Sequence, residues 1–213
     1  MAFVLTFSLN TYNSVLNLNH NLAFWGFDNS DVYVSREGGE SHDQVMSTLK
    51  KDDRVRAIVP RDVVMTAIAD QGGIASTNVI GFSYHGDMDA IEMLNLEGRH
   101  PERENEISIS VLTAEKYNKS VGDTVDVYIE GERRTYLITG IYQSLNGGGF
   151  GFRIQESALQ EVNPDVHANT YAVKLHADAD PVQFARDMQQ QLGQSYNVRT
   201  AAESGEINFS AIT

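Results

Sequence analysis

The sequence has no cysteine, and this absence excludes several kinds of site at once. Without a thiol among its 213 residues, the chain forms no disulfide bond, no thiol nucleophile and no cysteine-based zinc site. The absence fits a location outside the cytoplasm, where stray thiols are oxidised. Many cytosolic proteins also lack cysteine, so this feature does not decide the compartment by itself.

Positive charge is also scarce. The chain has 16 Lys and Arg residues against 29 Asp and Glu residues, which gives a formal net charge of -13 at pH 7. A nucleic-acid surface needs clustered basic side chains to neutralise phosphates, so this charge argues against a nucleic-acid partner. It equally argues against direct adsorption to an anionic leaflet. Acidity keeps a domain soluble and names no partner.

No hydrophobic run at the start of the chain is long enough to cross a bilayer. The apolar stretch Ala2–Leu9 is far shorter than the roughly 20 residues that a membrane helix needs. It also lacks the basic flank and cleavage site of a signal peptide. Two interpretations remain: a buried segment of an ordinary domain, or the outer end of a membrane helix.

The first 24 residues have the pattern of a single helix. Apolar residues recur at helical spacing from residue 3 to about residue 24, at Leu5, Leu9, Tyr12 and Leu16. Asparagines fill the other face, which is too polar to remain in lipid. We therefore predict a stem helix that ends before Gly26.

Two copies of one strand-helix-strand pattern lie far apart in the sequence. The first has a strand at Asp31–Ser35, a helix at His42–Lys50 and a strand at Val55–Val59. The second has a strand at Thr170–Leu175, a helix at Pro181–Leu192 and a strand at Tyr196–Thr200. Ser41 and Asp180 are the expected helix caps, because their side chains satisfy free amide donors. Two such units with one-sided helices predict an α+β fold of the ferredoxin-like split β-α-β type.

The material between the two copies is richer in strands. Hairpins are predicted around Gln71–Gly73 and around Glu130–Glu132, each between apolar alternating runs. Short helices are predicted over Asp87–Leu94, Leu112–Asn118 and Glu156–Val162. This composition predicts an inserted β-rich lobe.

Clusters that carry catalytic or metal chemistry are not visible. The cluster His85–Asp89 places one imidazole and two carboxylates close together, but a loop leading into a helix explains it better. The six histidines fall in different predicted elements without metal-ligand spacing, and no nucleophile elbow is present. We therefore predict a protein that is not an enzyme and has no cofactor or metal of its own.

A glycine-rich stretch, Asn146–Phe152, lacks the lysine and hydroxyl residue of a phosphate-binding loop. We interpret it as a flexible connection with two exposed aromatic residues, Phe150 and Phe152, as candidate contacts for a partner or cargo. Arg99 is a third candidate. For Arg99 we favour a structural role, in which it pairs with a nearby carboxylate or backbone carbonyl.

The order of short motifs over residues 97–142 is the most informative feature of the chain. Gly-Arg-x-Pro at Gly98–Pro101 is followed by Asn-Glu-Ile-x-Ile-Ser at Asn105–Ser110, Val-Gly-Asp-Thr-Val at Val121–Val125 and Leu-Ile-Thr-Gly-Ile-Tyr at Leu137–Tyr142. This order resembles the extracytoplasmic, MacB-like periplasmic core domain of FtsX-like ABC transporter permeases. In that family the domain lies between the first and second membrane helices, so the resemblance favours a truncated membrane helix at residues 2–9.

The resemblance implies a domain plan and a set of partners. The plan has a juxtamembrane stem (1–27), a porter-type split subdomain (28–60 with 168–203), an inserted β-rich lobe (61–167) and a return towards the membrane (204–213). It implies a cytoplasmic ABC ATPase subunit, a second permease in a dimer, and an extracytoplasmic protein or peptide cargo. The expected location is the outer side of a bacterial cell membrane. The expected role is to couple ATP hydrolysis to export or to an extracytoplasmic partner.

Two alternatives stay open at this point. An extracytoplasmic sensor or ligand-binding module would have a closed pocket between the two parts and a saturable thermal shift with a small molecule. A small hydrolase would need titratable residues that converge in a cleft.

Overall fold

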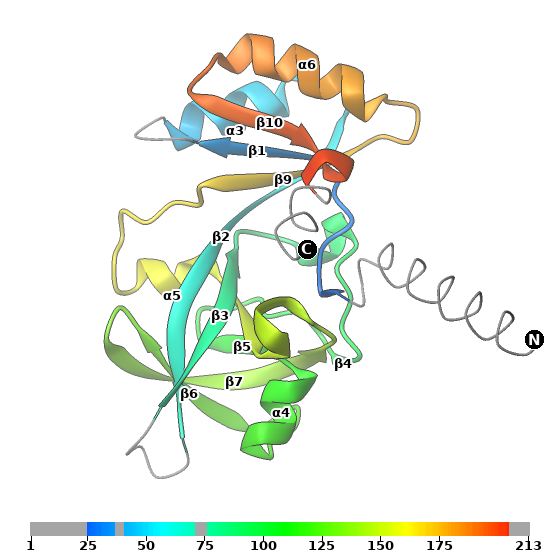
Figure 1. Cartoon of the computed structure of the whole chain (residues 1–213). Coiled ribbons are helices and arrows are strands. Elements are labelled where there is room, and N and C mark those ends of the chain that lie inside the picture. Colours follow the sequence, from blue (N-terminus) through cyan, green and yellow to red (C-terminus); the bar gives the residue numbers. More distant parts are fainter. Residues whose placement is uncertain (1–24, 37–40, 71–75, 205–213) are drawn as a thin grey trace, which may run out of the picture.

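The computed structural model describes residues 25–36, 41–70 and 76–204. Two stacked parts make up this region, with the chain passing from one part to the other and back (Figure 1). The predicted stem helix and the predicted return at 205–213 lie outside the described residues. The strands are β1 (Val32–Arg36), β2 (Val55–Ala69), β3 (Ser76–Tyr84), β4 (Glu97–Gly98), β5 (Glu106–Ser110), β6 (Thr124–Ile129), β7 (Glu132–Tyr142), β8 (Gly151–Gln155), β9 (Thr170–Leu175) and β10 (Tyr196–Thr200). The helices are α3 (His42–Lys50), α4 (Val111–Tyr117), α5 (Glu156–Gln160) and α6 (Pro181–Leu192), with 3-10 turns η1 (Met88–Ile91) and η2 (Asn146–Gly149).

The first part, here called the split part, joins the two predicted strand-helix-strand units in one sheet. Its strand order is β10-β1-β9-β2, with every neighbour antiparallel. Helices α3 and α6 bury Leu49, Phe184 and Met188 against this sheet. The predicted caps are present: Ser41 accepts a hydrogen bond from the amide of Gln44, and Asp180 accepts from those of Val182 and Gln183. The split part therefore has an α+β arrangement in which units distant in sequence share a core.

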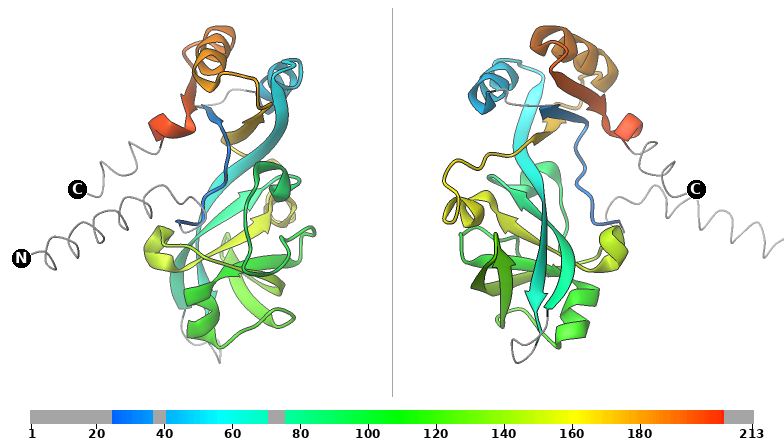
Figure 2. Two further views of the ribbon diagram at one scale, coloured as in Figure 1. Left: turned by 90° about the vertical axis from the view of Figure 1, so that its right-hand side faces the viewer. Right: turned by 60° about the vertical axis from the view of Figure 1, so that its left-hand side comes forward.

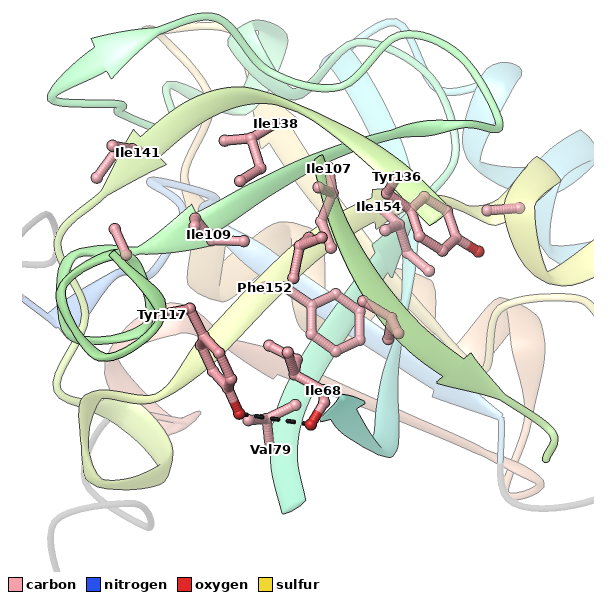
Figure 3. Packing of buried hydrophobic residues seen from close by; sticks show 14 of the residues in the cluster. Ile68, Val79, Ile107, Ile109, Tyr117, Tyr136, Ile138, Ile141, Phe152 and Ile154 are labelled. Carbon is pink, nitrogen blue, oxygen red and sulfur yellow. Dashed lines mark hydrogen bonds between the residues drawn. The ribbon is translucent and has the colours of Figure 1, made fainter. Parts of the chain in front are cut away.

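The second part, here called the lobe, is built from β3 to β8 and the far half of β2. The predicted hairpins form as β2–β3 and β6–β7, while β3 pairs with β8 and β5 with β7 in parallel. Its core gathers apolar side chains from several strands and from α4 (Figure 3). Ile68, Ile107, Ile138 and Phe152 are each fully buried there.

Strand β2 runs through both parts without a break. It pairs with β9 from Val55 to Arg61 and with β3 from Arg61 to Ala69. We predicted two separate strands with a boundary between residues 60 and 61, so that boundary falls inside a continuous strand. Pro60 has no amide to donate to the ladder, and its carbonyl accepts the amide of His85 at 2.8 Å. The two parts consequently share one sheet.

Two of the three predicted short helices are smaller than predicted. Only one 3-10 turn, η1, forms in the stretch Asp87–Leu94, and it ends at Glu92 in the left-handed region. Helices α4 and α5 lie where predicted, and α5 is shorter than expected.

Candidate functional site

The segment that leads into the split part is held by both parts of the molecule. We call residues 25–31 the connector. The Ser144 hydroxyl of the lobe donates to the Trp25 carbonyl at 3.2 Å. At the other end, the Asp31 amide donates to the Val173 carbonyl of β9 at 2.9 Å, and the Asp31 carboxylate accepts the Leu175 amide at 2.8 Å. A chain entering the domain is thus fixed first to the lobe and then to the split part.

An ion pair with a buried carboxylate lies in the middle of the connector. Asp28 is 1% exposed, and its carboxylate accepts hydrogen bonds from the Ser30 amide at 3.1 Å and the Tyr33 hydroxyl at 2.8 Å. The Arg61 guanidinium of β2 donates to the same carboxylate at 3.1 Å and lies over the Tyr33 ring at 5.0 Å. Three donors therefore satisfy the Asp28 carboxylate where solvent does not reach it.

The titration behaviour of the neighbours follows from this burial. Burial and the Asp28 carboxylate raise the pKa of Tyr33 well above its ordinary value, so its hydroxyl remains a donor. Burial works against the charge of Arg61, but Asp28, Tyr84 and Tyr33 outweigh it and raise its pKa. The Arg61 guanidinium is therefore positively charged at any physiological pH.

A second buried cation holds the start of the connector. Arg153 of β8 is 1% exposed and donates to the Gly26 carbonyl at 3.0 Å and to the Leu94 carbonyl at 3.1 Å. Its guanidinium carbon lies 3.7 Å from the centre of the Tyr142 ring. Among the described residues no carboxylate lies within ion-pair distance of it. Carbonyl dipoles and an aromatic face take the place of a counter-ion.

Arg61 and Arg153 lie on the same side of the junction, beside a small apolar cluster. Tyr84, Met88 and Ile91 are nearly inaccessible there and pack against Val59 of β2. We call this arrangement the clamp: Asp28, Arg61 and Arg153 with the rings of Tyr33 and Tyr142. It can fix the connector in place, and it offers no nucleophile or base to a substrate.

The structure gives Arg99 the structural role that we favoured. Its guanidinium donates to both carboxylate oxygens of Glu106 at 2.7 Å. Glu106 also accepts the amides of Glu102 and Arg103. These bonds, the one from Arg99 first, lower the pKa of Glu106 from 4.5 to about 2. The Gly-Arg-x-Pro stretch is thereby tied to the start of β5.

The expectation for Phe152 was wrong. Phe152 is fully buried in the lobe core, because β8 is covered on both faces and alternation turns this side chain inward. Gly81 of β3 makes room for its ring, since a Cβ atom there would lie 2.2 Å from the Phe152 Cζ atom. Phe150 is partly buried against the same core, with the Lys116 ammonium 5.5 Å from its ring centre. Phe150 therefore remains the only accessible aromatic of the two.

The acidic cluster at residues 85–89 has structural contacts. Asp87 caps η1 by accepting the amide of Asp89, and the His85 imidazole lies 3.0 Å from the buried carboxylate of Glu156. Two histidines that we placed in unrelated elements, His42 and His167, stack at 4.8 Å. Within the described ranges no three His, Asp or Glu side chains converge in a way that suits a metal ion.

Sequence reasoning missed every charged residue of the clamp. Asp28 lies just after the predicted end of the stem helix, and Arg61 lies between two apolar runs. Arg153 is flanked by Phe152 and Ile154, which in a half-exposed strand would indicate a solvent-facing arginine. No local signal distinguishes that case from an arginine buried by a second part.

Comparison with known families gives one match that spans most of the chain. The family model described as the MacB-like periplasmic core domain matches residues 3–191. The chain belongs to this family. A comparison with curated proteins gives no match. The family match confirms the resemblance that the motifs of residues 97–142 indicated.

Solved structures of low sequence identity share the fold of this MacB-like domain. The periplasmic region of MacB from Actinobacillus actinomycetemcomitans is 10% identical, with a TM-score of 0.64 over 90% of this chain and 95% of that one. The extracellular domain of the noncanonic ABC-type transporter YknZ from Gram-positive bacteria is 16% identical, with a TM-score of 0.60 over 79% of this chain and 98% of that one. A domain of a putative permease from Porphyromonas gingivalis is 12% identical, with a TM-score of 0.50 over 80% of this chain and 86% of that one. The first of these is a periplasmic region, and the second is an extracellular domain of a transporter. No described helix of this chain has the length and apolar character to span a membrane.

Proposed function

We propose that this domain is a non-catalytic, extracytoplasmic part of an ABC transporter permease that transmits motion between the membrane and the outside. In this proposal the split part is a ferredoxin-like, porter-type subdomain, and residues 61–167 are its inserted lobe. Its partners are a cytoplasmic ABC ATPase, reached through membrane helices, and a second permease in a dimer. The location is the outer side of a bacterial cell membrane.

The observation that carries the proposal is the double attachment of the connector. Arg153 and Ser144 hold its first residues to the lobe, while Asp31 joins its last residue to β9. Asp28 between them is bound to Arg61 on the strand that runs through both parts. A displacement of the preceding chain would therefore move the split part and the lobe together rather than unravel one of them.

Buried charge suits such a junction better than apolar contact alone. A charged pair has one favourable geometry, whereas apolar surfaces slide over one another at little cost. The continuous strand β2 also stiffens the junction between the two parts, because bending it would break its pairing with β9 and β3. The net charge of -13 supports a partner other than nucleic acid.

The test uses the intact permease reconstituted with its ATPase in liposomes. This domain has no cysteine, so Val182→Cys places a single spin label on α6, where the valine is 46% exposed. Any cysteine elsewhere in the permease is replaced beforehand. The distance between the labels of two permeases is measured without nucleotide and with ATP. We expect ATP to change this distance in the parent protein and not in the Asp28→Asn variant, with ATP hydrolysis retained in both.

The matched control is Arg56→Met, which removes an exposed arginine paired with Glu92 at 3.5 Å. This variant should respond to ATP like the parent protein. Equal responses in Asp28→Asn and the parent would refute a coupling role for the clamp. A saturable thermal shift with a small molecule, without any ATP-dependent distance change, would favour the sensor alternative instead.

A further inference from the structure

The outer face of the β2–β3 hairpin exposes apolar side chains. Met65 is 82% exposed and Val63 55% exposed, and they pair across the hairpin with Ile80 and Phe82. In the right-hand view of Figure 2 the β2–β3 ribbon lies in front, with no other described element drawn over its lower half. Exposed apolar side chains gathered on one face of a soluble domain indicate a contact surface.

This face is hollowed beside the turn that joins β6 to β7. A groove of about 650 Å³ has Met65, Ala67 and Ile80 along its floor. The turn residues Glu130 and Gly131 form one wall. A groove of this size holds a few side chains of a partner.

The one charged residue that lines the groove is acidic. Glu130 is the only charged residue that lines it, and no ion pair to its carboxylate occurs within the part of the chain that the structure describes. A partner with a positively charged side chain complements this rim.

The backbone of β2 is also open along the same stretch. On the side opposite β3, the strand is paired with β9 as far as Arg61 and with β6 only at Ala67 and Ile68. Between these points, Asp62–Thr66 has no strand beside it among the described residues, and the Val63 amide already donates to the Asp62 carboxylate at 2.8 Å. An open stretch of strand offers amide and carbonyl groups to an added extended chain.

We propose that the groove and the open stretch of β2 bind an extended segment of another polypeptide. Its apolar side chains, at alternate positions, contact Met65 and Val63, and a lysine or arginine faces Glu130. A second copy of this domain is disfavoured, because a symmetric contact would bring together the acidic rims of two chains with a net charge of -13 each. The inference does not rest on the coupling proposal, since the groove lies in the lobe and shares no residue with the clamp.

The probe is a synthetic octapeptide with blocked ends, in which valine and threonine alternate between two terminal lysines. One comparator contains the same residues with the valines adjacent, and another has glutamate in place of lysine. Binding to the domain is measured by calorimetry and by amide shifts in NMR spectra. We expect saturable binding of the alternating peptide, weaker binding at high salt, and at least tenfold weaker binding of both comparators.

Three variants of the domain locate the site. Met65→Glu and Glu130→Lys should each weaken binding at least tenfold, and both change exposed side chains that the fold does not need. Val182→Glu is the control, since it places the same charge on an exposed valine of α6. Absence of saturable binding, or binding that Met65→Glu leaves unchanged, overturns the proposal. Concentration-dependent dimerisation that Met65→Glu abolishes overturns it too, because a second copy would then be the occupant.

Discussion

The lobe core and the junction between the two parts meet at one strand but are built from opposite materials. On β8, Phe152 turns into the lobe core, and its neighbour Arg153 turns towards the connector. Both side chains are buried, at 0% and 1% exposure. Apolar packing holds the core together. At the junction, two arginines contact backbone carbonyls, a carboxylate and aromatic rings instead. Apolar packing and connector contacts therefore lie on different faces of the same strand, and the proposed coupling role rests on the second face.

The contrast between the lobe core and the junction explains how the two parts keep a defined arrangement relative to each other. Apolar packing contributes most of the free energy of folding and has little directional preference. Charged groups in a buried site contribute less net stability, but a wrong geometry leaves them unsatisfied at a high cost. The junction is consequently the place where a small change should alter the arrangement of the two parts as well as the stability.

The largest expected effect tests the core side of β8. Phe152→Ala should lower the free energy of unfolding by about 4 kcal/mol, because it leaves a cavity against Gly81 and its neighbours. Urea denaturation measures the change. Phe150→Ala is the control, and its partly buried ring should cost about 1 kcal/mol. Equal costs for the two variants would contradict the placement of Phe152 in the core.

The next effect tests the junction side of the same strand. Arg153→Met should destabilise the domain by about 3 kcal/mol, since the carbonyls of Gly26 and Leu94 lose their donors. Amide hydrogen exchange should also rise in the connector more than in the lobe core. Arg56→Met, which removes an exposed arginine, should change stability by less than about 0.5 kcal/mol. A uniform rise in exchange across both parts would show that the arginine serves the whole fold instead.

A double-mutant cycle sharpens the comparison within the clamp. Asp28→Asn and Arg61→Met should each destabilise the domain, and the double variant should cost less than the sum of the two. The expected coupling free energy is about 2 kcal/mol, because either single change leaves a charge at the junction without its partner, and the Asp28 carboxylate is fully buried. Urea denaturation of all four proteins gives the value. Additive costs would mean that the pair does not act as a unit.

The smallest effect concerns the Arg99–Glu106 pair, which lies in the lobe and is half exposed on the arginine side. Arg99→Ala should cost about 1.5 kcal/mol at pH 7, reduced by solvent screening of the guanidinium. Glu106 has a folded pKa of about 2 against an ordinary value of 4.5. Its contribution is therefore complete above about pH 4.5 and is lost as the pH falls towards 2.

Urea denaturation between pH 7 and pH 2.5 measures this dependence. The difference in stability between the parent protein and Arg99→Ala should narrow over the acid part of the range. Arg103→Ala is the control, because only the backbone amide of Arg103 contacts Glu106. A difference that stays constant down to pH 2.5 would count against the pair as its source.

Short-range sequence patterns predicted much of the fold. The caps at Ser41 and Asp180 and the hairpin turn at Glu130–Gly131 lie where the sequence indicated them. The pairing of two distant strand-helix-strand units also followed from their matched patterns. The caps and turns depend on groups within a few residues of one another, so a short stretch of sequence contains the necessary information. The motif order over residues 97–142 likewise indicated the family without any structure.

The sequence by itself thus determined the order of elements, most helix starts, the hairpins and the family. Only the tertiary structure decided that β2 is continuous through Pro60, that Phe152 is buried and that Asp28 meets Arg61. Each of these depends on which surface a second part of the chain covers. Strand β8 is covered on both faces, so its residues do not alternate between buried and exposed. The sequence around Arg153 therefore does not indicate that this arginine is buried. Burial and charge pairing between distant segments are properties of packing, and packing is not encoded in any single stretch.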